Sequence, residues 1–186
     1  MKLQTNSEQL PQDSGIQFNI LEYPRHIVHE FELSDPEDSL THFIKEQAFE
    51  FDRLLISKTY VAEIGRKVIG FISLTCTEIK FEDDVADDSG HPVNNFQSKP
   101  AVKITRLAVD QRYQRQGIGQ ILLAQSFSLV VDTIRETVGC RFLVLDARKD
   151  KIDWYQSFGF ELVGTHENMM RECPIMFLDL RDLVER

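Results

Sequence analysis

The segment LAVDQRYQRQGIGQILL, residues 107–123, constrains the fold most, because it leads from a strand-like stretch into a helix through two glycines. Its first residues are apolar and suit a buried strand, and the apolar residues after Gly119 recur with helical spacing. A helix N-terminus has unpaired N–H donors and a partial positive charge, and glycine has no Cβ to keep an anion away. The segment therefore predicts either a tight strand-to-helix turn or a phosphate-binding loop.

Composition narrows the class of protein. The 186 residues suffice for one ordinary domain with a hydrophobic core, and the net charge is −9. This acidity argues against nucleic acid as the default partner and suits a cationic substrate. Three cysteines without metal-ligand spacing, a polar start and the lack of a long apolar run predict a reduced, cytoplasmic protein without a metal site.

The pattern of apolar and turn residues predicts a mixed α/β domain over residues 16–186, after a flexible tail at 1–15. Ser34 or Asp35 is expected to cap the first helix, and Gly65 to turn a hairpin. The acidic stretch 82–100 predicts a loop that is either solvated or guides a substrate. The expected strands are 16–23, 26–33, 58–64, 68–81, 101–109, 141–147 and two short ones at the end, and the expected helices follow 34, 119 and 151.

The glycine turn does not match the best-known phosphate loops. A P-loop needs GxxxxGK[ST], and a dinucleotide fingerprint needs a third glycine where Leu122 stands. What remains is Q/R-x-x-G-x-G, filled by Gln114, Gly117 and Gly119. Further along, FLVLDA and WYQSFGF supply a buried strand and a helix with an aromatic–Tyr–x–x–x–Gly–Phe ending, and YVAEIGRKVIGFISLT supplies a hairpin before the turn.

These motifs, in this order, resemble the GNAT superfamily of N-acetyltransferases over roughly residues 58–180. The resemblance implies a single mixed, mostly antiparallel sheet flanked by helices, with two adjacent central strands that splay where acetyl-CoA enters. It implies that the strand at 107–109 pairs with the pantetheine arm and that the following turn holds the pyrophosphate. The implied cofactor-binding residues are Leu107, Ala108, Val109, Gln114, Arg115, Gln116, Gly117, Ile118, Gly119 and Gln120.

Tyr155 is the implied catalytic residue. Acyl transfer to an amine expels a thiolate, and a phenol near the sulfur can donate a proton to it. The alternative is that Tyr155 only anchors the cofactor. Arg112 and Arg115 either add positive charge beside the cofactor or lie on the surface. No general base is evident, and Glu78 is either a candidate or an ordinary exposed carboxylate. Arg148 and Lys151 depart from the residues usual in the family.

The resemblance implies transfer of acetyl from acetyl-CoA to a primary amine, and the charge favours a small-molecule or peptide substrate. Two alternatives stay open. The same sequence motifs also resemble toxin-type acetyltransferases that act on aminoacyl-tRNA. A non-catalytic CoA-binding sensor domain would also carry the same glycine turn. Nucleic acid and membranes are expected not to be partners, and a homodimer is left open.

Overall fold

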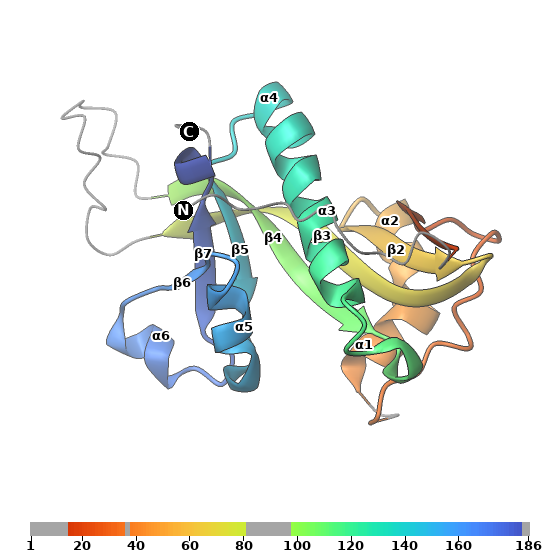
Figure 1. Ribbon diagram of the computed structural model, residues 1–186. Coiled ribbons are helices and arrows are strands. Elements are labelled where there is room, and N and C mark those ends of the chain that lie inside the picture. Colours follow the sequence, from red (N-terminus) through yellow and green to blue (C-terminus); the bar gives the residue numbers. More distant parts are fainter. Residues whose placement is uncertain (1–14, 36–37, 81–97, 184–186) are drawn as a thin grey trace. The chain divides into compact units, whose positions relative to one another are not determined.

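The computed structural model describes residues 15–35, 38–80 and 98–183 (Figure 1). Within them, seven strands form one mixed sheet in the order β1-β2-β3-β4-β5-β7-β6, and helices flank it, which confirms the expected fold class. β4 pairs parallel with β5, whereas β1/β2, β2/β3, β5/β7 and β6/β7 pair antiparallel. The strands are β1 (Ile16–Ile20), β2 (Lys58–Ile64), β3 (Lys67–Lys80), β4 (Ser98–Val109), β5 (Phe142–Asp146), β6 (Glu161–Leu162) and β7 (Ile175–Asp179).

The contacts divide the chain into two compact units. The first unit comprises Met1–Thr75 and Thr105–Ser128, and the second comprises Cys76–Ile104 and Leu129–Arg186. The long strands β3 and β4 contribute residues to both units. The expected tail lies outside the described residues except for Gly15, and so does most of the expected loop at 82–100, whose last residues begin β4.

In the first unit, one helical stretch covers a face of the sheet. It consists of α1 (Ser39–His42), a π-helical turn (Phe43–Gln47) and α2 (Ala48–Arg53). Asp38 caps it by accepting a hydrogen bond from Leu40 N at 2.8 Å, so the expectation of a cap at Ser34 or Asp35 was wrong. The helices bury a core made of Leu21, Phe31, Phe43, Ile44, Ala48, Val61, Val68, Phe71 and Ala108.

Residues 26–33 do not form the expected strand. They make one isolated bridge, Ile27 with Lys67, in which Ile27 N donates to Arg66 O at 2.7 Å and Val68 N donates to Ile27 O at 3.1 Å. A turn follows, closed by Phe31 N donating to Val28 O. The apolar residues that predicted a strand still contribute to the core, since Phe31 is fully buried, but the segment that carries Phe31 is irregular.

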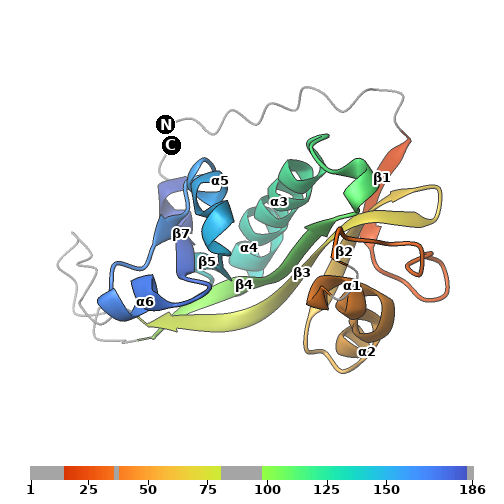
Figure 2. The same cartoon turned by 90° about the horizontal axis from the view of Figure 1, so that it is seen from below.

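The opposite face of the sheet in the first unit is covered by α3 (Ile118–Leu129), as Figure 2 shows. Gly70 on β3 permits this packing. A Cβ at that position would lie 3.1 Å from both Ile118 Cγ2 and Leu122 Cδ1, which is tighter than ordinary contact. The helix continues through a π-helical turn (Val130–Ile134) into α4 (Arg135–Thr137).

The second unit has its own core around β5, which consists of Ile79, Ala101, Phe142, Val144 and Val163. The helix expected from residue 151 is short, α5 (Ile152–Gln156), and Gly159 follows with a φ of 89°. The sequence did not predict α6 (His166–Met170), which Thr165 caps. None of the helices in the described segments is long and apolar enough to cross a membrane.

Candidate functional site

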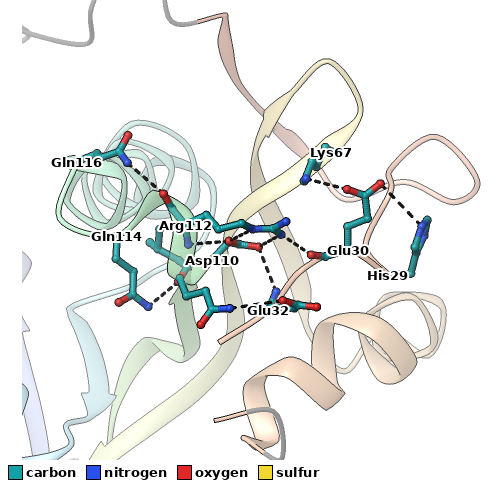
Figure 3. A network of polar contacts seen from close by, with 10 residues as sticks. His29, Glu30, Glu32, Lys67, Asp110, Arg112, Gln114 and Gln116 are labelled. Carbon is teal, nitrogen blue, oxygen red and sulfur yellow. Dashed lines mark hydrogen bonds and ion pairs between the residues drawn. The ribbon is translucent and has the colours of Figure 1, made fainter. Parts of the chain in front are cut away.

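The end of β4 extends past its parallel partner. The register between β4 and β5 runs from Ala101↔Phe142 to Ile104↔Leu145, and Leu107, Ala108 and Val109 lie beyond it. Their backbone can therefore pair with an extended ligand in the manner of an added strand. The Gln114 side chain folds back on this strand end, with Nε2 donating to Val109 O at 3.0 Å (Figure 3).

The turn after β4 is held by a carboxylate that the sequence analysis did not single out. Asp110 is fully buried and caps a 3-10 turn (Gln111–Tyr113), accepting from Arg112 N at 2.9 Å. Its other oxygen accepts from the backbone N of Glu32 at 3.1 Å. An aspartate two residues before its backbone donor is the usual start of such a turn, so this part of its role was readable from sequence.

Arg112 completes the network around Asp110. Its Nε donates to Oδ1 at 2.8 Å, its Nη2 donates to Oδ2 at 2.6 Å, and Nη2 also donates to Glu30 O at 2.5 Å (Figure 3). Burial alone would raise the pKa of Asp110, but hydrogen bonds from Arg112 and from the backbone outweigh it and lower that pKa. The charge of Arg112 is thus committed to Asp110.

Arg115 is placed differently. It is exposed, and in the part of the chain that the structure describes it has no ion pair or hydrogen bond. Its φ is 61°, a left-handed conformation that is uncommon for a residue with a side chain and that recurs at functional sites. Of the two arginines expected near the cofactor, only Arg115 keeps its charge available to a phosphate.

The two glycines of the turn differ in what their backbone requires. Gly117 has a φ of 82°, so the turn itself needs a glycine there. Gly119 lies in the first turn of α3, where the backbone is helical and does not itself require a glycine. A turn alone therefore explains Gly117 and leaves Gly119 unexplained, whereas a ligand that approaches the start of the helix explains both.

Backbone donors are available at this helix start. Outside the helix itself, no hydrogen bond of the described residues is donated by the backbone N–H groups of residues 114–119. The first hydrogen bond that closes the helix is donated by Ile121 N to Gly117 O at 3.1 Å. Such free donors at the positive end of a helix fit a pyrophosphate.

All the predicted cofactor-binding residues lie in the first unit, whereas Tyr155 lies on α5 in the second. Its ring is half-buried against Trp154 and Phe160, with centroids 4.8 and 5.7 Å away. Burial raises the pKa of Tyr155 to about 12. The hydroxyl makes no hydrogen bond with another described residue, so it remains free to act on a ligand.

The candidate base Glu78 is an exposed carboxylate at 59% side-chain exposure, and it pairs with Lys80 at 3.5 Å. Because this carboxylate is exposed and already paired with a lysine, the structure favours the ordinary surface role. The positions that depart from the family pattern also lie at the surface, where Arg148 and Lys151 both pair with Asp150.

Comparison with known proteins agrees with this arrangement. Residues 56–162 match the family model described as an acetyltransferase (GNAT) domain. A tRNA-acetylating toxin from Mycobacterium tuberculosis is 27% identical over 134 residues, which cover 71% of this chain and 78% of that protein. AtaT complexed with acetyl-methionyl-tRNAfMet has 20% identity and a TM-score of 0.77, covering 91% of this chain and 98% of that one. AtaTR bound with AcCoA has 20% identity and a TM-score of 0.74, covering 92% and 99%.

The mixed sheet with an open strand end, the glycine turn and the helix N–H donors fit an acyltransferase that takes its acyl group from a coenzyme A thioester. The chain belongs to the GNAT acetyltransferase family, whose model covers more than half of it. Acetyl-CoA is therefore its co-substrate, as the sequence predicted. The expectation that nucleic acid is an unlikely partner conflicts with these relatives and is not kept.

Proposed function

We propose that the protein transfers acetyl from acetyl-CoA to the α-amino group of an aminoacyl-tRNA. The observation that carries this proposal is the similarity, over most of both chains, to a tRNA-acetylating toxin. The likeness to AtaT, solved in a complex with acetyl-methionyl-tRNAfMet, supports it through the shared fold. A cytoplasmic location, where acetyl-CoA and charged tRNA are both available, is part of the same proposal.

The chemistry of the acceptor supports this choice over a polyamine or a lysine side chain. An α-amino group has a pKa of about 7.7–8.0, whereas a lysine-type amine has a pKa of about 10.4. At pH 7 roughly a tenth of an α-amine is therefore neutral, a fraction several hundred-fold larger than for a lysine-type amine, so an α-amine can attack without a dedicated base. Since Glu78, the candidate base, is exposed and paired with Lys80, an acceptor that needs no base suits this chain better.

The net charge of −9 does not stand against a tRNA substrate. Five of the negative charges lie between Glu82 and Asp88, so the remainder of the chain is much closer to neutral. Several cations in the described residues have no acidic partner, among them Arg106, Arg115 and Lys149. Phosphate contacts depend on such local charges more than on the total.

In the proposed reaction the backbone N–H groups of 114–119 bind the pyrophosphate of acetyl-CoA, and the backbone of Leu107–Val109 orients its pantetheine arm. The thioester supplies an activated acetyl group. The neutral α-amine attacks the thioester carbonyl, so that a carbon–nitrogen bond forms and the carbon–sulfur bond breaks. The proton on the Tyr155 hydroxyl moves to the departing sulfur, the attacking nitrogen releases one proton to solvent, and Tyr155 regains a proton from solvent before the next turnover. A thiol has a pKa of about 8.5, so protonating the thiolate makes it a better leaving group.

The test is a panel of acceptors with labelled acetyl-CoA at low salt: a polyamine, an aminoglycoside, a lysine peptide, and bulk tRNA in aminoacylated and deacylated form. We expect label on aminoacyl-tRNA alone, and mild alkaline hydrolysis should release an N-acetyl amino acid. Label mainly on a polyamine, aminoglycoside or peptide would restore the small-molecule interpretation that the acidity favoured. Size measurement tests for a homodimer, and co-purification tests for an antitoxin partner of the kind that AtaT has.

A further inference from the structure

Arg106 lies on an aromatic platform in the first unit. Its guanidinium carbon is 3.8 Å from the centroid of the Phe43 ring and 5.4 Å from that of Phe51. Both distances are within the range of a favourable cation–π contact. Phe43 is fully buried, and the two rings meet edge-to-face with centroids 5.6 Å apart, so the platform is fixed. Stacking uses the face of the guanidinium and leaves the N–H donors at its edge unused.

No anion of the described residues neutralises Arg106. In the described segments it makes neither an ion pair nor a hydrogen bond, and its side chain is half-buried. Burial lowers the pKa of this guanidinium, although arginine stays charged at any physiological pH. A half-buried cation without a partner is costly, and most arginines of the chain avoid that cost. Those that pair with a carboxylate are Arg25, Arg53, Arg112, Arg135, Arg141, Arg148, Arg171 and Arg181.

The side of the sheet on which Arg106 lies separates it from the proposed pyrophosphate site. Successive side chains of a strand point to opposite faces, so Arg106 shares a face with Ala108, whose cluster includes Phe43. That face is the one covered by α1 and α2 (Figure 2). The glycine turn leads into α3, which packs on the other face through Ile118 and Leu122. The free donors of Arg106 therefore point away from the phosphates of acetyl-CoA.

We infer that Arg106, held by Phe43 and Phe51, binds a phosphate of the acceptor substrate at its aminoacylated end. The inference rests on the proposed function and names the residue that recognises that acceptor. The position of Arg106 in β4 supports the inference, because Arg106 directly precedes the residues whose backbone is proposed to orient the acetyl donor. In an aminoacyl-tRNA the carboxyl group of the amino acid is esterified, so the anionic groups common to all such acceptors are phosphates. Planar, two-pronged recognition of phosphate is what a guanidinium does best.

The test compares two small acceptors that differ by one phosphate: aminoacyl-adenosine, esterified on its ribose, and the same ester of adenosine 5′-monophosphate. The amino acid is the one acetylated fastest on tRNA. The proteins are the wild type, Arg106→Gln, Arg106→Lys, and Arg53→Gln as a control for general surface charge, since Arg53 is exposed on α2 and pairs with Glu50. We expect the wild type to prefer the phosphorylated acceptor by about 10- to 100-fold in kcat/KM. Arg106→Gln should lose that preference, Arg106→Lys should keep part of it, and Arg53→Gln should keep it all.

Further measurements distinguish the ways in which the inference can fail. The KM for acetyl-CoA should stay unchanged in every variant, and a rise in Arg106→Gln would place the phosphate contact on the cofactor and overturn the inference. Equal preference in wild type and Arg106→Gln, with aminoacyl-tRNA still acetylated, would overturn the inference alone. If the wild type acetylates no aminoacyl acceptor, both the inference and the proposed function fall. Should Arg106→Gln fail to fold, Arg106→Lys and Arg106→Met carry the same comparison.

Discussion

The guanidinium of Arg112 donates to both carboxylate oxygens of Asp110, at 2.8 and 2.6 Å, and thereby fixes the turn that leads from β4 to α3. The same carboxylate accepts from the backbone of Glu32 on a segment far away in the sequence. The glycine turn is therefore held from one side by tertiary structure, which keeps its N–H groups in place before any ligand arrives. Such preorganisation lowers the ordering cost of binding an anion.

Replacing Asp110 by Asn should destabilise the protein by about 1.5–3 kcal/mol, because hydrogen bonds from charged and backbone donors to a buried carboxylate are lost. Chemical denaturation at neutral pH measures this change. The affinity for acetyl-CoA should fall as well, since the turn loses its anchor. Asp150→Asn is the matched control: this carboxylate is exposed, and its partners among the described residues are Arg148 and Lys151, so its loss should be nearly neutral. Equal effects of the two substitutions would contradict the role given to Asp110.

The contribution of Asp110 should depend on pH in a defined direction. Its pKa is lower in the folded protein than the usual value of about 3.9, so the ionised carboxylate stabilises the fold above that pH. The stabilisation should be lost as the pH falls through the lowered pKa. The difference in unfolding free energy between wild type and Asp110→Asn should therefore be constant from about pH 5 to 7 and shrink below about pH 4. A difference that grows on acidification would contradict the assignment.

Gly119 offers a test that separates stability from binding. Because its backbone is helical, Gly119→Ala should leave the melting temperature unchanged or raise it. The same methyl group should weaken acetyl-CoA binding, because it projects where the pyrophosphate approaches the helix start. Calorimetric titration with acetyl-CoA measures the affinity. Gly139→Ala serves as the control, since a Cβ there meets open space. Unchanged affinity in Gly119→Ala would remove the pyrophosphate from this turn.

The local signals in the sequence were reliable where neighbouring residues decide the structure. Gly65 turns the β2–β3 hairpin with a φ of 65°, and the glycine turn and α3 follow β4 as predicted. The failures involve distant partners. The backbone of Ile27 is bridged to Lys67, but none of the strands in the described segments pairs with residues 26–33 along their length to form a ladder.

The site shows the same division between local and distant information. The sequence motif marks residues 107–120, but the anchoring of Asp110 depends on Glu32, which is 78 residues away. The two rings that hold Arg106, those of Phe43 and Phe51, likewise belong to helical residues that lie far before β4 in the sequence, on the other side of the β2–β3 hairpin. In the sequence these two arginines, Arg106 and Arg112, look alike. Only the fold shows that a carboxylate neutralises Arg112, whereas none within residues 15–35, 38–80 and 98–183 pairs with Arg106.

Tyr155 provides the decisive test of the chemistry. Burial raises its pKa to about 12, so the hydroxyl keeps its proton throughout the working range and can donate it to a thiolate. Tyr155→Phe should lower kcat by about 10²–10⁴-fold and change the KM for acetyl-CoA little. Tyr23→Phe is the control, because Tyr23 is 79% exposed.

The pH profile of wild-type kcat distinguishes an acid from an anchor. A tyrosine with an ordinary pKa would begin to lose its proton near pH 10, whereas with the raised value no alkaline loss from Tyr155 should appear below about pH 11. The raised pKa also makes the folding stability depend on pH. The contribution of Tyr155 to the free energy of unfolding is fully present below about pH 10 and is lost as the pH rises through about 12. If Tyr155→Phe weakens acetyl-CoA binding while kcat at saturation stays normal, the hydroxyl anchors the cofactor and the proton for the departing thiolate comes from solvent.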